Sequence, residues 1–345
     1  MLVNKHFNAK NLFEFTGHHF IWLTIWMTSV TIGYQYTGLE KYEIPWLPLS
    51  IIATAVAFYV GFKNNSAYDR MWEARKIWGA IVNSSRAWGS AVKSFVDSNY
   101  SDEDITDEQL FQIKKKLIYR HIGWLYALRS QLLIITPWEH ASQGFLVSSK
   151  AKRYKEFFGL GLVKDEITET ELHLFLPEEE YERMINYKNT ATQIIDQQSQ
   201  DLAELRSKNL INDFRHIKLQ EILNDFYDHQ GKCERIKKFP LPRQYGSIGA
   251  IFVGIFIFLL PFGMVSEFAK LGEYGIWASI PFTVLVGWIY IVMEIVGDYT
   301  ENPFEGLAND VPMLSLCRVI ENDLREMLGE TKLPEDIKAK NGVLM

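Results

Sequence analysis

Cysteine is scarce in this chain, with only Cys233 and Cys317 among 345 residues. No C-x-x-C pair is present, and we expect both thiols to be free and in a reducing compartment. The phosphate-loop pattern G-x-x-x-x-G-K-[ST], the dinucleotide pattern G-x-G-x-x-G and the zinc pattern H-E-x-x-H are also missing. We therefore expect no enzymatic activity and no cofactor.

A surplus of basic residues is missing too. The formal net charge is -6 and the isoelectric point is near 5.8, which argues against nucleic acid as a partner. The chain shows neither an internal repeat nor the strong alternation of apolar and polar residues that is typical of strands. From Asp104 to Arg129 and from Glu178 to Tyr227, apolar residues instead recur at helical spacing. The acidic run Glu178–Glu180 follows a proline and predicts a solvated helix start.

The apolar residues are concentrated in a few runs. Mean hydropathy is only -0.07 although 48% of the residues are hydrophobic. A membrane-spanning helix needs about 20 mostly apolar residues, and two runs near the C-terminal end reach that length, whereas two earlier runs are shorter but flanked by aromatic residues. We predict an all-α membrane protein whose four transmembrane helices lie in His19 to Tyr36, Leu47 to Phe62, Gly246 to Phe268 and Ile276 to Val296.

Basic residues predict the orientation of these helices. The loops "TGLEKYEIP" and "EFAKLGEYG" carry only Lys41 and Lys270, so both should lie outside the cytoplasm. We expect a multi-pass protein of the inner (plasma) membrane with both termini cytoplasmic. Its predicted parts are residues 1–63 with the first two membrane helices, a cytoplasmic helical region (64–244), two further membrane helices (245–297) and a cytoplasmic C-terminal segment (298–345).

The stretch "LPLSIIATAVAFYVGFKNNSAYDRMWEARKIWG" passes from an apolar run to a charged one without a break. On a helix, Thr54, Phe58 and Phe62 form one stripe, and a second stripe of Ala53, Ala57 and Gly61 runs beside it. Small residues allow close helix approach in a membrane. A ring of identical helices could turn the aromatic stripe toward a pore, but periodicity alone favours a helix inside a monomeric bundle with two ordinary packing faces.

Four quoted segments carry a resemblance to a known family. These are "GFKNNSAYDRMWEARKIWG", "GKCERI" followed by "PLP", "LLPFG", and "ENPFEGLANDVPMLSLCRVIENDL". Their order and spacing resemble the bestrophin family, particularly its bacterial members, over roughly residues 5 to 325. The resemblance is weakest between Ser101 and Asn209.

The resemblance implies a homopentameric channel in membrane lipid, with a central pore that conducts monovalent ions. Family members have a narrow neck with three hydrophobic rings from the second membrane helix, and the matching positions are Thr54, Phe58 and Phe62. A second constriction, the cytosolic aperture, corresponds to Phe214 when counted back from Cys233.

The conducted ion differs between members of this family. Animal members resemble calcium-gated anion channels, and some bacterial members conduct cations. Two phenylalanine rings favour anions such as chloride, because the edge of an aromatic ring is partly positive, although Thr54 makes its end of the neck more polar. The alternatives are a sodium channel of the same family, or a membrane-anchored helical interaction protein or transporter.

Calcium activation is not expected, because the acidic run that follows "NPF" in animal members is missing. The remaining metal candidates are weak: Asp298, Glu301, Glu305 and Asp310. Glu294, Asp298 and Glu301 also recur at helical spacing, and they would bind a cation or a neighbouring arginine, or simply cap the end of the last membrane helix.

Overall fold

The computed structural model describes residues 1–3, 9–38, 44–99, 101, 104–158 and 172–345. Within these ranges the chain is helical, and it forms no strand beyond isolated bridges such as Leu2 with Val343. The predicted all-α class is therefore confirmed for the described residues. The main helices are α1 (Ala9–Tyr36), α2 (Trp46–Phe95), α3 (Asp107–Leu132), α4 (Phe145–Phe158), α6 (Glu178–Met184), α7 (Thr190–Ser207), α8 (Asp213–Lys238), α9 (Arg243–Ala269), α10 (Glu273–Asp298) and α11 (Met313–Met327), with a 3-10 turn η2 (His140–Ser142).

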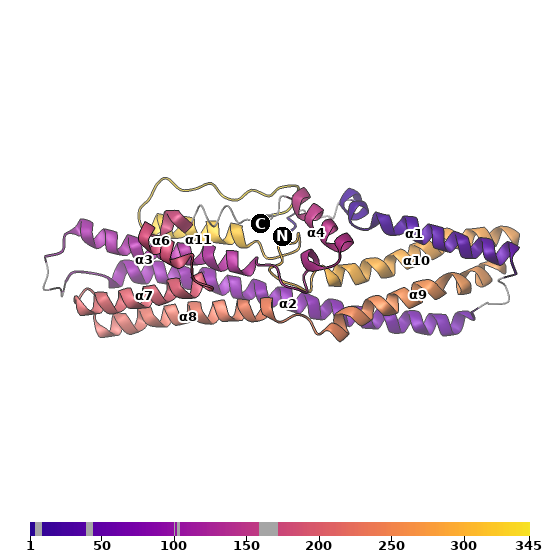
Figure 1. Ribbon diagram of the computed structural model, residues 1–345, viewed down its shortest axis with the longest axis horizontal. Helices are drawn as coiled ribbons and strands as arrows, with labels where there is room; N and C mark the ends of the chain where they lie inside the picture. The colour runs from indigo at the N-terminus through magenta and orange to yellow at the C-terminus, as the bar shows by residue number, and fades with distance from the viewer. Residues whose placement is uncertain (4–8, 39–43, 100, 102–103, 159–171) are drawn as a thin grey trace. The chain divides into compact units, whose positions relative to one another are not determined.

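The chain forms two compact units. Unit 1 contains Met1–Val3, Trp72–Phe239 and Pro303–Met345, and unit 2 contains Asn4–Met71 and Pro240–Asn302. Within unit 1, α3 packs on α7, α8 and α11, and within unit 2, α1 packs on α9 and α10 (Figure 1). These divisions differ from the four sequence segments because α2 continues without a break past residue 63 and because unit 1 includes the C-terminal segment.

Unit 2 has an apolar core to which four helices contribute. Its buried members come from α1, α2, α9 and α10, and include Leu23, Met27, Leu49, Val56, Val60, Val253, Phe256, Leu260, Val284 and Ile291. Three helical stretches in the described ranges are long and apolar enough to cross a membrane, namely those in Trp46–Phe95, Asp213–Ala269 and Tyr274–Asp298. The protein is therefore a membrane protein. The helix α1 is 28 residues long but is not among the three.

The helix α2 is continuous over 50 residues. Its proline, Pro48, lies in the first turn, where a missing backbone N–H costs little. Gly89 lies deep in the helix and serves packing, because a Cβ atom there would lie 2.5 Å from Leu324 Cδ2 of α11. Glycine at this point lets α11 approach the backbone of α2.

The expected helical block from Glu178 to Tyr227 is divided into α6, α7 and α8. Two asparagines start new helices: Asn189 Oδ1 accepts from Thr192 N and Asn212 Oδ1 accepts from Arg215 N, both at 2.9 Å. Asparagine is among the preferred N-cap residues because it satisfies an otherwise unpaired backbone donor. The apolar periodicity continues across both caps, and the sequence pattern therefore hid them.

One member of the acidic run Glu178–Glu180 is not solvated as predicted. Glu180 is buried, and both of its oxygens accept hydrogen bonds from Arg120 of α3, at 2.6 and 2.7 Å. Arg120 also pairs with Asp201 of α7. The prediction of a solvated start was wrong for this residue, because the buried guanidinium of Arg120 needs a compensating charge and hydrogen-bond acceptors, which Glu180 helps to supply.

His121 lies at the centre of unit 1, in an aromatic cage. Its ring stacks on Phe226 and Trp124, with centroid distances of 4.3 and 5.3 Å, and its Nε2 lies 2.9 Å from Ser85 Oγ. Complete burial lowers the pKa of His121 from 6.5 to about 3, so the ring is neutral in the folded protein.

This neutral histidine predicts a loss of stability in mild acid. The unfolded chain binds a proton below pH 6.5, whereas the folded chain does not until about pH 3, so stability falls as the pH drops through this window. Between pH 7.5 and 5, His121 should contribute a loss of about 2 kcal/mol. Chemical denaturation of His121→Gln should show a correspondingly flatter pH profile, and a slope equal to the parent's would contradict this role of His121.

Candidate functional site

The stripe of Thr54, Phe58 and Phe62 is exposed on α2. The side chains of Phe58 and Phe62 are 66% and 63% exposed, and Thr54 is exposed as well. Packing inside the chain therefore does not explain the two phenylalanines. Of the two interpretations that periodicity left open, an ordinary packing face within the chain is excluded for this stripe.

The opposite face of α2 is the packed one. Since a helix turns about 100° per residue, Val56, Val60 and Lys63 lie on the side opposite the exposed stripe, and all three are buried. The helix is thus oriented by the core of unit 2 so that its phenylalanines point away from that core.

The small-residue stripe has no close neighbour of this chain at its end. A Cβ atom at Gly61 would meet nothing within 4 Å, although Ala53 packs against the core of unit 2. The close helix approach that the small residues suggested is therefore not made at Gly61 by any described residue.

Phe214 is the second residue of α8, two positions after the helix-capping Asn212. Its side chain is 84% exposed, one of the highest values for a large apolar residue among the described residues. Helical spacing explains this exposure, because at about 100° per residue Phe214 lies on the side of α8 away from its buried face of Leu219, Leu223 and Phe226.

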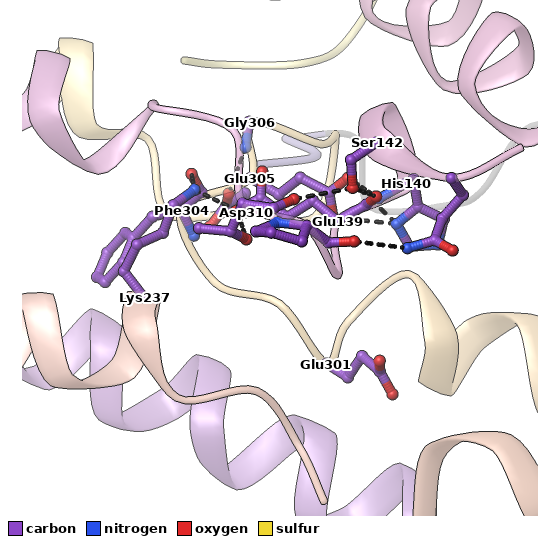
Figure 2. A network of polar contacts seen from close by, with 12 residues as sticks. Glu139, His140, Ser142, Lys237, Glu301, Phe304, Glu305, Gly306 and Asp310 are labelled. Carbon is purple, nitrogen blue, oxygen red and sulfur yellow. Dashed lines mark hydrogen bonds and ion pairs between the residues drawn. The ribbon is translucent and has the colours of Figure 1, made fainter. Parts of the chain in front are cut away.

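The loop after Pro303 is held by one carboxylate. Asp310 accepts hydrogen bonds from the backbone N–H groups of Phe304, Gly306 and Val311, at 3.0, 2.8 and 2.7 Å. Burial raises the pKa of Asp310, and these backbone bonds oppose that rise. The carboxylate thus closes the loop on itself (Figure 2).

A buried lysine joins the same loop to α8. Lys237 Nζ pairs with Glu139 and donates to Phe304 O at 3.1 Å, and all three residues are buried (Figure 2). Phe304 has a φ of 68°, in the left-handed region that is unfavourable for a bulky residue. Lys237 and Asp310, which bind its O and N atoms, therefore hold a strained backbone.

Two of the other three candidate carboxylates, Glu305 and Glu301, also have protein partners. Glu305 accepts from His140 N at 2.8 Å and lies 3.0 Å from His140 Nδ1, within unit 1. Glu301 of unit 2 is 2% exposed and lies 3.5 Å from Arg243. The described residues contain no group of three or more His, Cys, Asp or Glu placed to hold a metal ion. Asp298 ends α10.

Sequence reasoning missed an ion pair between α2 and α10. Lys63 is fully buried, and its Nζ lies 2.5 Å from Glu294 Oε1. The neighbouring Asn64 donates to Met293 O at 2.9 Å. The sequence predicted that Glu294 binds a cation or a neighbouring arginine, or caps the last membrane helix. It did not identify Lys63 as the partner.

A signal for both buried lysines was present in the sequence. Lys63 follows Val56 and Val60 at helical spacing, and Lys237 follows Gln230 and Cys233 in the same way on α8. A lysine on the packed face of a helix requires a partner. The sequence does not say which carboxylate supplies it.

The chain is similar in sequence to a known protein family and to several named proteins. The family model described as "Bacterial/Fungal Bestrophin protein" matches residues 18–326. The chain is 26% identical over 290 residues to the "Voltage-dependent anion channel-forming protein YneE" of Escherichia coli K12, covering 84% of this chain and 79% of that protein. It is 24% identical over 283 residues to the "Voltage-dependent anion channel-forming protein mll4386" of Mesorhizobium japonicum, covering 82% of this chain and 75% of that protein.

A solved structure shares the fold. The crystal structure of a bacterial bestrophin homolog from Klebsiella pneumoniae matches with a TM-score of 0.73 and 19% identity, over 91% of this chain and 99% of that chain. Neither cysteine of the present chain forms a disulfide bond, as the sequence predicted, and both are buried.

Proposed function

Because the chain belongs to the family of bacterial and fungal bestrophins, we propose that it forms a homopentameric, ion-conducting channel. The family places it among channel proteins and not among enzymes. The proposed channel crosses the inner membrane with four helices per subunit, namely α1 together with the apolar parts of α2, α9 and α10. Both termini lie in the cytoplasm in this proposal. Membrane lipid and monovalent ions are its partners.

The observation that carries this proposal is the exposed stripe on α2. Phe58 and Phe62 are solvent-exposed although the helix is packed on its opposite side. Five copies of this face around one axis would form a hydrophobic neck with rings from Thr54, Phe58 and Phe62, a constriction of the type that gates by dewetting. The relatives named as anion channel-forming proteins favour anions, such as chloride, as the conducted species.

Reconstitution tests the proposed function. Purified protein in planar bilayers with asymmetric sodium chloride should give a current whose reversal potential lies near the chloride equilibrium potential. A reversal potential near that of sodium would identify the cation-channel alternative. A detergent-solubilised mass of one or two subunits, together with silent bilayers, would favour the interaction protein or transporter.

The second constriction is proposed at Phe214, whose side chain is largely exposed. Replacement by alanine should widen the aperture and alter relative permeability among anions of different size, while the pentamer stays intact. The measurement is a permeability series from reversal potentials, with Ile217→Ala, an exposed neighbour on α8, as the matched control. An unchanged series in folded Phe214→Ala pentamers would remove Phe214 from the pore.

We also propose that Glu301 and Asp310 brace their loops and bind no activating calcium ion. Asp310 is occupied by three backbone N–H groups and Glu301 faces Arg243. The open probability should therefore stay flat when calcium is titrated. A steep rise in the parent that disappears in Glu301→Ala would show that a calcium site is present.

A further inference from the structure

The helix α10 is bonded to α2 on both sides of the proposed neck. Tyr290 OH donates to Ala53 O at 3.0 Å, next to Thr54. At the other end, Lys63 and Asn64 bind Glu294 and the carbonyl of Met293, directly after Phe62. All of these residues belong to unit 2. The three exposed ring positions are thus bracketed by polar contacts to a single neighbouring helix.

The contacts at the Phe62 end are built closely. The side chains of Lys63 and Glu294 are only 1% and 10% exposed. A Cβ atom at Gly249 of α9 would lie 2.8 Å from Glu294 Oε2, and one at Gly297 would overlap Asn64. Glycine on both sides therefore leaves room for this polar group, which we call the α2–α10 latch (Lys63, Asn64, Met293 and Glu294).

A buried ion pair adds little net stability, because the loss of hydration of both charges offsets their attraction. Replacing such a pair with apolar side chains of similar volume is often neutral or stabilising, so a buried pair suits a different role better, such as fixing one alignment of two elements. The core contacts of α2 near this point include the aliphatic Val56 and Val60, whose contacts are not directional. Directional contacts come from Tyr59 OH, which donates to Gln244 O of α9 at 2.9 Å, and from the bond of Tyr290 to Ala53 O. The latch adds a buried, charged contact to these two hydrogen bonds.

We propose that the Lys63–Glu294 pair is a positioning device that sets the rotation of α2 and thereby the orientation of the Phe62 ring. The inference rests on the proposed channel function. Lys63 follows Phe62 in the chain, so a rotation of α2 that broke the ion pair would turn Phe62 by the same angle. α10 is then the element through which movement elsewhere in unit 2 reaches the neck.

The test separates positioning from stability. Glu294→Gln keeps the volume but weakens the pair, and Lys63→Met/Glu294→Met removes both charges so that neither is left buried alone. Arg86→Met is the matched control, since Arg86 also lies on α2 and pairs with Asp323 at 2.7 Å, with both side chains partly exposed. All variants are studied as reconstituted full-length protein.

Two readouts are expected to change together in both latch variants. The odds of channel opening should rise about fivefold or more, a usual size for coupling between two sites. A charged thiol reagent should also modify Phe62→Cys about fivefold faster or more in the same backgrounds. Background labelling should be low, because Cys233 and Cys317 are buried. Arg86→Met should match the parent in both.

The variant Lys63→Met/Glu294→Met distinguishes a positioning role of the ion pair from a purely structural one. If it melts like the parent but opens and labels like Glu294→Gln, the pair positions the ring. If it restores melting, opening and labelling to the parent's values, the pair is only structural and the proposal is overturned. If Phe58→Ala/Phe62→Ala changes opening while both latch variants do not, the neck assignment is supported and the positioning role of the latch is overturned. If none of these variants changes opening, both the neck assignment and the positioning role are overturned.

Discussion

Channels that carry Phe58→Ala/Phe62→Ala are expected to open far more often than the parent. The proposed ring of five phenylalanines would exclude water because it offers apolar surface without hydrogen-bonding groups, whereas alanine would leave a wider passage that water enters more easily. We expect the odds of opening to rise about tenfold or more, which requires only about 1.4 kcal/mol. Thr54→Ala should have a smaller effect, because threonine is already small and wettable.

Single-channel recording in planar bilayers provides the measurement. Phe258→Ala/Phe282→Ala is the matched control, because it removes two equally exposed phenylalanines from α9 and α10. A packing role for Phe58 and Phe62 would give a different result, with a loss of about 3 to 5 kcal/mol per ring in stability and unchanged gating in the surviving channels. That outcome would contradict the neck assignment.

The second large effect is expected from Lys237→Met. The change leaves Glu139 buried without its ammonium partner and removes the donor to Phe304 O. Breaking one side of a buried pair typically costs about 3 to 5 kcal/mol. Lys238→Met is the control, because Lys238 is adjacent and its exposed side chain pairs with the half-buried Glu234, a contact that should contribute less than about 1 kcal/mol. Chemical denaturation in detergent measures both losses.

The pH dependence of the stability loss in Lys237→Met tests whether the unpaired Glu139 carboxylate causes it. Burial already raises the pKa of Glu139 in the folded protein, and Lys237 opposes that rise. Without Lys237 the carboxyl takes up a proton on folding, so the stability loss should shrink as pH falls toward 4.5, the ordinary value for glutamate. Adding Glu139→Gln should recover much of the loss at neutral pH. Equal losses in Lys237→Met and Lys238→Met would show that the buried pair is unimportant.

Helix type and the presence of two distinct faces on α2 were predictable from sequence because they depend on local periodicity. Helical spacing alone separates the Phe58 and Phe62 face from the Val56 and Val60 face, but it left open which of the two is exposed. The continuous α2 was predictable as well, since its interior contains no proline beyond the first turn.

The polar partners were not predictable, because each joins residues far apart in the chain. Glu180 belongs to an acidic run that looks solvated, yet one of its members is held by Arg120, which lies 60 residues earlier. Lys237 and Lys238 are identical in type and adjacent, but only Lys237 faces the core. Sequence spacing identifies the buried face, while the carboxylate that reaches it depends on the tertiary fold.

The separation of Lys63 and Glu294 by 231 residues also bears on biogenesis. A ribosome that adds about 5 to 20 residues per second needs roughly 10 to 50 seconds to make the intervening chain. During that time Lys63 has been made while its carboxylate partner has not, and the α9 and α10 part of the core that packs on Val56 and Val60 is also missing. In the nascent chain, α1 and the apolar part of α2 should therefore depend on lipid, the insertion machinery or chaperones until α9 and α10 have been synthesised.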